Sequence, residues 1–107
     1  MATRKPNNKT VATALAALGH EARLSVYRLL VRAGHDGLRV GEISEHLDMP
    51  ASTLAHHLRA LVDAGLVVQE KHGREVFNRP DFQVMTSIVG FMTKECCTGV
   101  QLKPSAA

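Results

Sequence analysis

The chain has few aromatic residues, and this shortage limits the kind of core that it can build. It contains no tryptophan, one tyrosine and three phenylalanines among 107 residues. Since 45% of the residues are apolar, the core must be aliphatic, and the length predicts a single domain. A core of this size gains stability when two copies of the chain associate.

Cysteines, long apolar runs and catalytic motifs are also scarce. Two adjacent cysteines cannot form the disulfide framework of a small secreted protein. No apolar run approaches the roughly 20 residues of a membrane span, and the N-terminus has no secretory signal. Paired carboxylates, a phosphate loop and a nucleophile triad are not visible. These absences predict a cytoplasmic protein with no membrane contact and no enzymatic activity.

The net charge favours a polyanionic partner only weakly. The formal charge is +3 and the estimated pI about 9.2, which is compatible with nucleic-acid binding without requiring it. Part of the excess lies near the ends of the chain, at Arg4, Lys5, Lys9 and Lys103.

Residues 40–68 predict a short helix, a turn and a longer helix. In the longer helix Leu54, Leu58 and Leu61, with Val62 beside them, recur at helical spacing and form an apolar stripe. Proline 50 fits the start of this helix, and Gly65 is a natural terminator. The side opposite the stripe is polar and carries Ser52, Thr53, His56, Arg59 and Asp63.

A helix, a tight turn and a second helix with short side chains at its exposed start have the geometry that enters a DNA major groove. The alternative is an ordinary helical hairpin. The next residues, LVVQEKHGREVFNRP, have β-branched and apolar residues on both sides of Gly73, which predicts a β-hairpin. Its tip carries Lys71, His72 and Arg74, donors suited to phosphate or to the minor groove. Together these segments predict a winged helix.

The remaining segments complete one domain over residues 10–97. Residues 1–9 predict a flexible tail, either solvated or tracking DNA, and residues 98–107 a second tail. Helices are expected from Thr10, with Val11, Leu15 and Leu18 on one side, and from His20 to Gly34. Residues 38–40 are short enough for a small strand. A last helix is expected from about Asp81 to Cys97. Its apolar residues occupy more of its surface than this small domain can bury by itself.

The sequence resembles the ArsR/SmtB family of bacterial metal- and thiol-responsive repressors over about residues 12–97. The segments that carry the resemblance are ALGHEARLSVYRLL at 17–30, HHLRAL at 56–61, AGLV at 64–67, and Gly73 with Arg74. It implies a mainly α fold with a small β-hairpin wing, in the order ααβααββα, and a homodimer formed through the first and last helices. The sequence departs from the family pattern at two positions. Pro50 stands where the family often has a capping serine, and Ala55 stands where it often has a polar residue.

The resemblance implies a role for each polar residue of the central segment. In a symmetric dimer Ser52, Thr53, His56 and Arg59 face operator half-sites about one helical turn, or a multiple of it, apart. Arg59 reaches either a guanine edge or a phosphate. Lys71 and Arg74 hold the DNA backbone and contribute salt-dependent affinity. His57 lies closer to the apolar stripe and is expected to be structural and hydrogen-bonded.

Cys96 and Cys97 are the residues that suggest an effector. Two soft thiolates a few ångströms apart suit trivalent arsenic, antimony or another thiophilic ion, and a disulfide between neighbouring residues is strained. In the resembled family arsenic sites also occur on the short helix, which here has no cysteine. Zinc sites of the last helix need histidines and carboxylates that are missing. A third ligand would come from water, a cellular thiol, a histidine or the other subunit.

The sequence thus predicts a sequence-specific repressor that leaves its operator when As(III) or Sb(III) binds Cys96 and Cys97. No cofactor is required, and zinc at the thiols is possible. Two alternatives remain: a regulator in which an oxidant acts on the same thiols, and a winged helix that serves only protein contacts.

Overall fold

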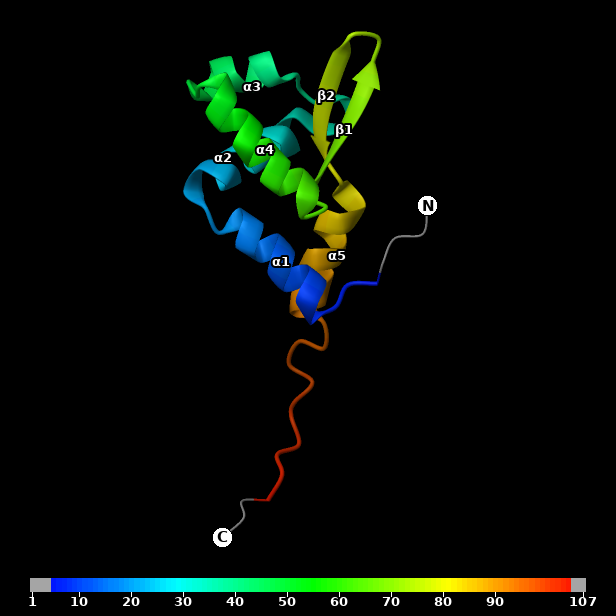
Figure 1. The fold of residues 1–107 in the computed structure, drawn as a ribbon. Helices are drawn as coiled ribbons and strands as arrows, with labels where there is room; N and C mark the ends of the chain where they lie inside the picture. The colour runs from blue at the N-terminus through cyan, green and yellow to red at the C-terminus, as the bar shows by residue number, and fades with distance from the viewer. Residues whose placement is uncertain (1–4, 105–107) are drawn as a thin grey trace.

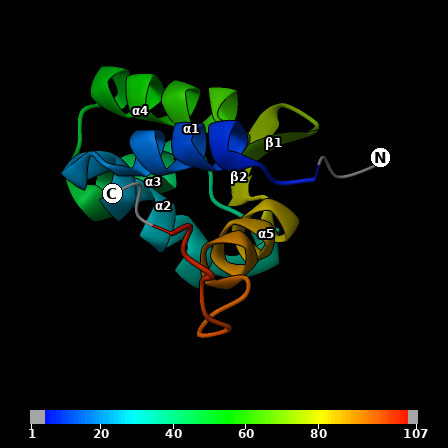
Figure 2. The same cartoon turned by 90° about the horizontal axis from the view of Figure 1, so that it is seen from below.

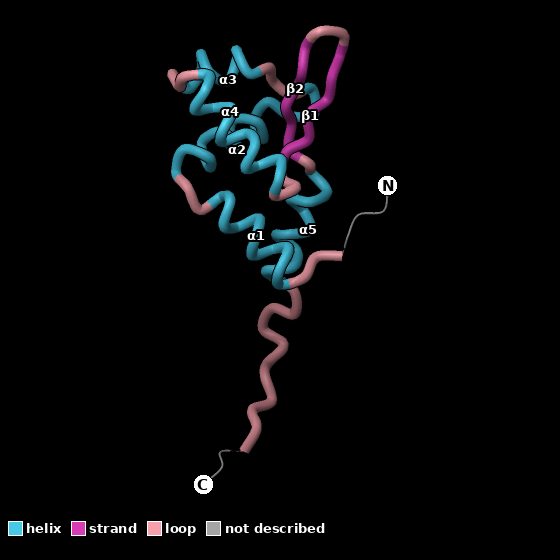
Figure 3. Tube along the Cα trace, in the orientation of Figure 1, coloured by secondary structure: helices cyan, strands magenta, loops and turns pink. Residues whose placement is uncertain are grey.

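The computed structural model describes residues 5–104, which form a mainly helical domain with a two-stranded hairpin (Figures 1 and 3). The predicted order ααβααββα is confirmed, with a single bridge in place of the first strand. Residues 1–4, including Arg4, and residues 105–107 are outer parts of the predicted tails and lie outside the described residues. The elements are α1 (Asn8–Leu18), α2 (Glu21–Ala33), the 3-10 turn η1 (Gly34–Asp36), α3 (Val40–Leu47), α4 (Ala51–Asp63), β1 (Val67–His72), β2 (Glu75–Pro80) and α5 (Phe82–Thr93).

The predicted small strand at 38–40 is reduced to one residue. Leu38 and Asn78 exchange two backbone hydrogen bonds, of 2.8 and 2.9 Å, and form an isolated antiparallel bridge. Val40 already begins α3. The bridge attaches the chain before α3 to the second strand of the wing, so the helix-turn-helix and the wing are held together at this point.

The core is aliphatic, as the composition predicts, and α4 contributes three of its leucines. Leu54, Leu58 and Leu61 of α4 are buried and pack with Val26 and Leu30 of α2 in one cluster. Each fully buried leucine contributes roughly 1.5–3 kcal/mol to folding. The predicted stripe of the longer helix is therefore confirmed, and its burial fixes which side of α4 faces outward.

Helix α1 packs through Val11 and Leu18, as their shared side suggests, but Leu15 of the same side faces outward. Its buried residues are Val11, Ala14 and Ala17, whereas Leu15 is 40% exposed. The small alanines allow α1 to lie close to α2 and α4, which turns Leu15 outward. The helix begins at Asn8, two residues before the predicted start, because Asn7 caps it through the N–H of Thr10 (2.9 Å).

Helix α5 is shorter than predicted. Asp81 caps it as expected, accepting a hydrogen bond from the N–H of Val84 (3.2 Å). The predicted end at Cys97 is wrong, because the helix stops at Thr93. Phe91 is the last residue of the helix that packs against the core, and a helix without packing is only marginally stable in water. Residues 94–97 form a turn instead.

The hairpin has the predicted turn. His72 pairs with Glu75, which leaves Gly73 and Arg74 as a two-residue connection. Gly73 has a φ of 64°, a conformation that glycine adopts without strain at the first position of a type II′ turn. None of the helices between residues 5 and 104 combines the length and apolar character that a membrane crossing requires.

Candidate nucleic-acid interface and thiol pair

The polar side of α4 is open. Ser52, Thr53, His56 and Arg59 are all exposed, and α4 lies at the outer edge of the domain in the view of Figure 2. Arg59 is the longest of these side chains, and its only described ion pair is with Asp63, one turn later on the same helix (3.6 Å). Such an exposed pair is worth little, so the guanidinium is available to another anion.

The start of α4 has no side-chain cap. Pro50 is the N-cap residue, and the first turn contains no acidic residue. The first N–H groups of a helix carry partial positive charge and bind phosphate readily when no side chain satisfies them. Because Pro50 provides no side-chain cap, the start of α4 is suited to an anion.

The wing tip lies at the same end of the molecule as α3 and the start of α4 (Figure 1). Lys71 and Arg74 are exposed there and form no ion pair with any residue between 5 and 104. The acidic Glu70 is occupied, since it contacts His72 (3.3 Å) and Arg79 (3.6 Å). The hydrogen bond from His72, and then the charge of Arg79, lower the pKa of Glu70. The six residues predicted to contact DNA are thus exposed, four on α4 and two on the wing.

Arg39 connects α3 to the wing, and it was not among the residues predicted from the sequence. Its N–H donates to Glu42 Oε1 (2.9 Å), and its Nη1 reaches Glu75 Oε1 of the wing (2.7 Å). The hydrogen bond from the Arg39 backbone, followed by its side chain, lowers the pKa of Glu42. The three-residue spacing to Glu42 is a visible capping signal. The contact with Glu75, 36 residues away, has no local signal.

His57 has the structural role that the sequence predicts. It is 6% exposed, and its Nδ1 accepts a hydrogen bond from Arg23 Nε (3.3 Å). The ring centroid of His20 lies 4.9 Å away and that of His56 5.7 Å away. Burial, and then the neighbouring His20, Arg23 and His56, lower the pKa of His57. A neutral His57 thus links α4 to the first turn of α2.

The two cysteines lie in the turn after α5, at the end of the domain opposite the wing tip (Figure 1). Both are exposed and not joined by a disulfide, and their Sγ atoms are 3.0 Å apart. The hydrogen bond with Cys97, and then desolvation, raise the pKa of the Cys96 thiol. This is the opposite of the lowered pKa that a catalytic thiol of an oxidoreductase requires.

The thiol pair offers two ligands to an ion. Within residues 5–104 no group of three or more histidines, cysteines or carboxylates is placed to hold a metal. Zinc prefers four ligands in tetrahedral geometry, so the described residues fit it poorly. A thiophilic ion that accepts two thiolates fits them better.

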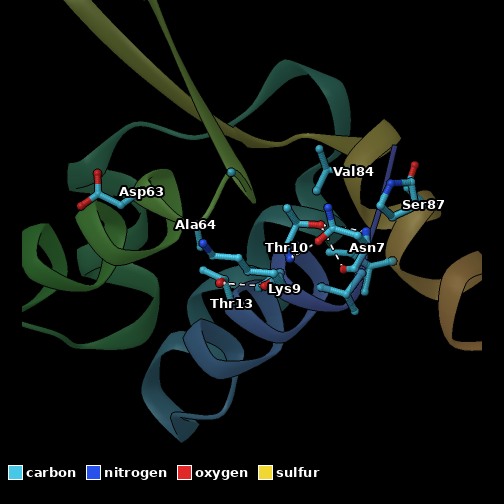
Figure 4. Close-up of a pocket in the computed structure, with 13 residues that line it drawn as sticks. Asn7, Lys9, Thr10, Thr13, Asp63, Ala64, Val84 and Ser87 are labelled. Atoms are coloured by element: carbon cyan, nitrogen blue, oxygen red, sulfur yellow. Dashed lines mark hydrogen bonds between the residues drawn. The ribbon is translucent and has the colours of Figure 1, made fainter. Parts of the chain in front are cut away.

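A hollow of about 540 Å³ lies where α1 begins, between the end of α4 and α5 (Figure 4). None of the candidate DNA or thiol residues lines it. Asn7 and Thr10 are hydrogen-bonded to each other, and the Thr13 hydroxyl donates to the Lys9 carbonyl (2.9 Å). Because these polar groups are already paired, we assign no ligand to this hollow.

Comparison with known proteins agrees with this geometry. A helix-turn-helix domain family matches residues 18–70. The chain is 42% identical over 60 residues to a Halobacterium salinarum protein named as the arsenical resistance operon repressor ArsR. The aligned region covers 56% of this chain and 46% of that protein, so the chain spans less than half of the relative's length. It is 30% identical over 74 residues to the HTH-type transcriptional regulator YceK of Bacillus subtilis, covering 69% and 73%. An ArsR-like transcriptional regulator from Rhodococcus sp. RHA1 has a TM-score of 0.70 at 25% identity, covering 80% and 78%.

An open helix of this kind beside a β-hairpin defines a winged helix-turn-helix DNA-binding regulator. The chain belongs to the ArsR/SmtB family of transcriptional regulators. Members of this family bind DNA and are not enzymes.

Proposed function

We propose that the chain is a homodimeric repressor in the cytoplasm that binds operator DNA and is released by a thiophilic inducer. Ser52, Thr53, His56 and Arg59 read or contact the major groove, and Lys71 and Arg74 contact the backbone. The observation that carries the proposal is the uncovered polar side of α4 beside a basic wing tip. The repressor and arsenic assignments draw support from the name of the Halobacterium relative.

The dimer is proposed from the apolar surface that one chain leaves open. A groove of about 380 Å³ lies between α1, α2 and α5. Leu15, Leu24, Val89 and Met92 line it and are 40%, 42%, 59% and 61% exposed. A second copy packed on this side would cover these residues and present two α4 helices to successive half-sites.

The inducer site is proposed at Cys96 and Cys97. Their turn continues directly from α5, which also contributes to the proposed dimer surface. An ion held there is therefore able to change how the two copies pack and how far apart their α4 helices lie. A coupling of about 1–3 kcal/mol is enough for a 5- to 150-fold loss of DNA affinity.

The test is binding of the reduced chain to a duplex from the promoter of its own gene, followed by fluorescence anisotropy. Arsenite is added with glutathione present, because the chain itself supplies two thiols. We expect release from the DNA, loss of that release in Cys96→Ser and Cys97→Ser, and full release in the matched control Thr98→Ser. DNA binding that persists in the wild type would end the inducer hypothesis. Failure to bind any duplex in a salt-dependent way would favour a winged helix used for protein contacts.

Thiol oxidation is the second candidate, and the exposure of both thiols favours it. A disulfide within the pair is disfavoured, because consecutive Cα atoms are about 3.8 Å apart and disulfides usually need about 4.4 Å or more. Oxidation would therefore act between copies or with a small thiol. Peroxide treatment followed by non-reducing electrophoresis distinguishes this route, since it produces a covalent dimer or a mixed disulfide.

A further inference from the structure

The wing is attached to the rest of the domain near its base. Leu38 and Asn78 exchange two backbone hydrogen bonds of 2.8 and 2.9 Å, and the Asn78 side chain also donates to the Leu38 carbonyl (3.1 Å). The neighbouring Gly37 lies so close to β2 that a Cβ there would stand 2.7 Å from the Asn78 carbonyl oxygen. The base of the wing is therefore held closely against the segment that precedes α3.

Arg39, the next residue of that segment, provides an attachment nearer the tip. Its Nη1 donates to Glu75 Oε1 (2.7 Å), and its Nε donates to Glu42 Oε1 of α3 (3.1 Å). Glu75 directly follows Arg74 and lies three residues before Asn78 on β2, which is about 10 Å along a strand. Arg39 thus joins α3 to the tip of the wing, whereas the bridge holds the base.

Two attachment points fix a direction that a single point leaves free. The sheet consists of β1 and β2 alone, with the bridge at Leu38 beside it, and a two-stranded hairpin is only marginally stable without further contacts. A hairpin held at its base swings about that point, and its tip carries Lys71 and Arg74 with it. The pair of Arg39 with Glu75 opposes this swing.

We infer that Arg39 is a positioning residue for DNA binding: through Glu75 it fixes the angle at which the wing presents Lys71 and Arg74 to the duplex. The inference rests on the proposed function, in which these two cations contact the DNA backbone. It adds a residue that acts without touching DNA. The Arg39 and Glu75 side chains are 47% and 50% exposed, so their pairing contributes little to folding, and its loss should alter the wing and leave the domain folded.

Charge alone predicts the opposite effect of removing the Glu75 carboxylate. A negative charge at the wing tip repels phosphates, so a neutral side chain there would strengthen DNA binding if only electrostatics mattered. If Glu75 anchors the wing to Arg39, the same change weakens binding. Glu70 is the matched comparison, because it lies on the same hairpin but pairs with His72 and Arg79, which both belong to the wing.

The experiment compares Arg39→Gln, Glu75→Gln, the double variant and Glu70→Gln in the full chain. Fluorescence anisotropy with a duplex from the promoter of its own gene measures affinity, and NMR relaxation of the backbone amides without DNA measures the order of the wing. An exposed ion pair lost from both copies of a dimer should weaken binding by about 2- to 30-fold in each single variant. The two losses should not add in the double variant. Glu70→Gln should bind at least as tightly as the wild type, and the wing should be less ordered in both single variants.

A second comparison separates positioning from direct contact. Arg74→Ala should reduce affinity by a smaller factor in the Glu75→Gln background than in the wild type, because a displaced wing no longer places Arg74 on the DNA backbone. An equal factor in both backgrounds would contradict the inference.

Three other results would overturn the inference. Tighter binding by Glu75→Gln, as for Glu70→Gln, would show that Glu75 acts only through its charge. Unchanged order of the wing in both single variants would show that the pair restrains nothing. Weaker binding by Arg39→Gln beside unchanged binding by Glu75→Gln would place Arg39 on the phosphates itself. If the wild type binds no duplex, the proposed function fails, and the relaxation measurement still decides whether Arg39 restrains the wing.

Discussion

Replacement of Arg74 by alanine tests the assignment of the wing tip to the DNA backbone. The side chain is exposed at the turn and forms no ion pair within residues 5–104. Its removal should therefore leave the free energy of unfolding within about 0.5 kcal/mol of the wild type. The expected effect is confined to DNA binding and to its dependence on salt.

The magnitude follows from the release of counterions. Each phosphate contact contributes about 0.9 to the slope of log K against log salt, so a dimer that loses two contacts loses about 1.8. If the affinity extrapolated to 1 M salt is unchanged, this slope corresponds at about 0.15 M salt to a loss of about 30-fold, or about 2 kcal/mol. Lys71→Ala should have an effect of the same size, since Lys71 is exposed on the same wing.

The assay is fluorescence anisotropy of a labelled duplex at several salt concentrations. Lys103→Ala is the matched control, because Lys103 is an exposed cation on the segment that leaves the opposite end of the molecule (Figure 1). Its slope should equal that of the wild type. An unchanged slope in Arg74→Ala, or an equal decrease in the control, would refute the proposed placement of the wing on the duplex.

Four further predictions concern α4, its surroundings and the dimer surface. Arg59→Ala should weaken operator binding by about 1–3 kcal/mol per half-site, measured with duplexes that carry single base changes. A loss of affinity that depends on one base position assigns a guanine contact to Arg59. A loss that is equal for all duplexes assigns a phosphate contact. Leu58→Ala removes a side chain that is 2% exposed and should lower the free energy of unfolding by about 2–5 kcal/mol in urea titrations. Val89→Glu should produce monomers in sedimentation experiments, whereas Val76→Glu on the wing, 38% exposed, should not. Burial lowers the pKa of His57 below 6.5, so below that pH the unfolded chain binds a proton that the folded chain excludes. Stability should fall as the pH drops from about 6.5 through the lower folded pKa, and His57→Gln should flatten this dependence in chemical denaturation.

The parts of the fold that the sequence predicted correctly are those in which local pattern and burial agree. The stripe of Leu54, Leu58 and Leu61 determined the orientation of α4, and one hairpin signal predicted the wing. The full order of elements was implied by the family resemblance. The single turn glycine, Gly73, located the wing tip. In each case the relevant residues are neighbours in the sequence.

The errors occurred where packing overrides the apparent pattern. In α1 the spacing puts Val11, Leu15 and Leu18 on one side, but close contact with α2 and α4 buries Ala14 and Ala17, and Leu15 faces outward. In α5 the apolar pattern continues to Cys96, yet the helix ends at Thr93, shortly after Phe91, its last residue packed against the core. Contacts between distant residues, such as Arg39 with Glu75, leave no periodic signal at all.

The early end of α5 changes how the proposed sensor communicates with the DNA. If α5 continued to Cys97, an ion at Cys96 and Cys97 would move the dimer surface directly, because the whole helix would move as a rigid body. Because the thiols lie in a turn, ion binding there would instead order the exposed turn. Its effect on α5 would depend on whether this ordering reaches Val89 and Met92, which are exposed in one chain. Coupling between arsenic binding and DNA binding therefore requires the dimer. A monomeric Val89→Glu variant should still chelate arsenic with wild-type affinity, but its affinity for DNA should be the same with and without arsenic. Chelation measured by mass spectrometry and DNA binding measured by anisotropy on the same variant separate these two effects, and a monomer that still responds to arsenic would show that the signal does not pass through the α5 surface.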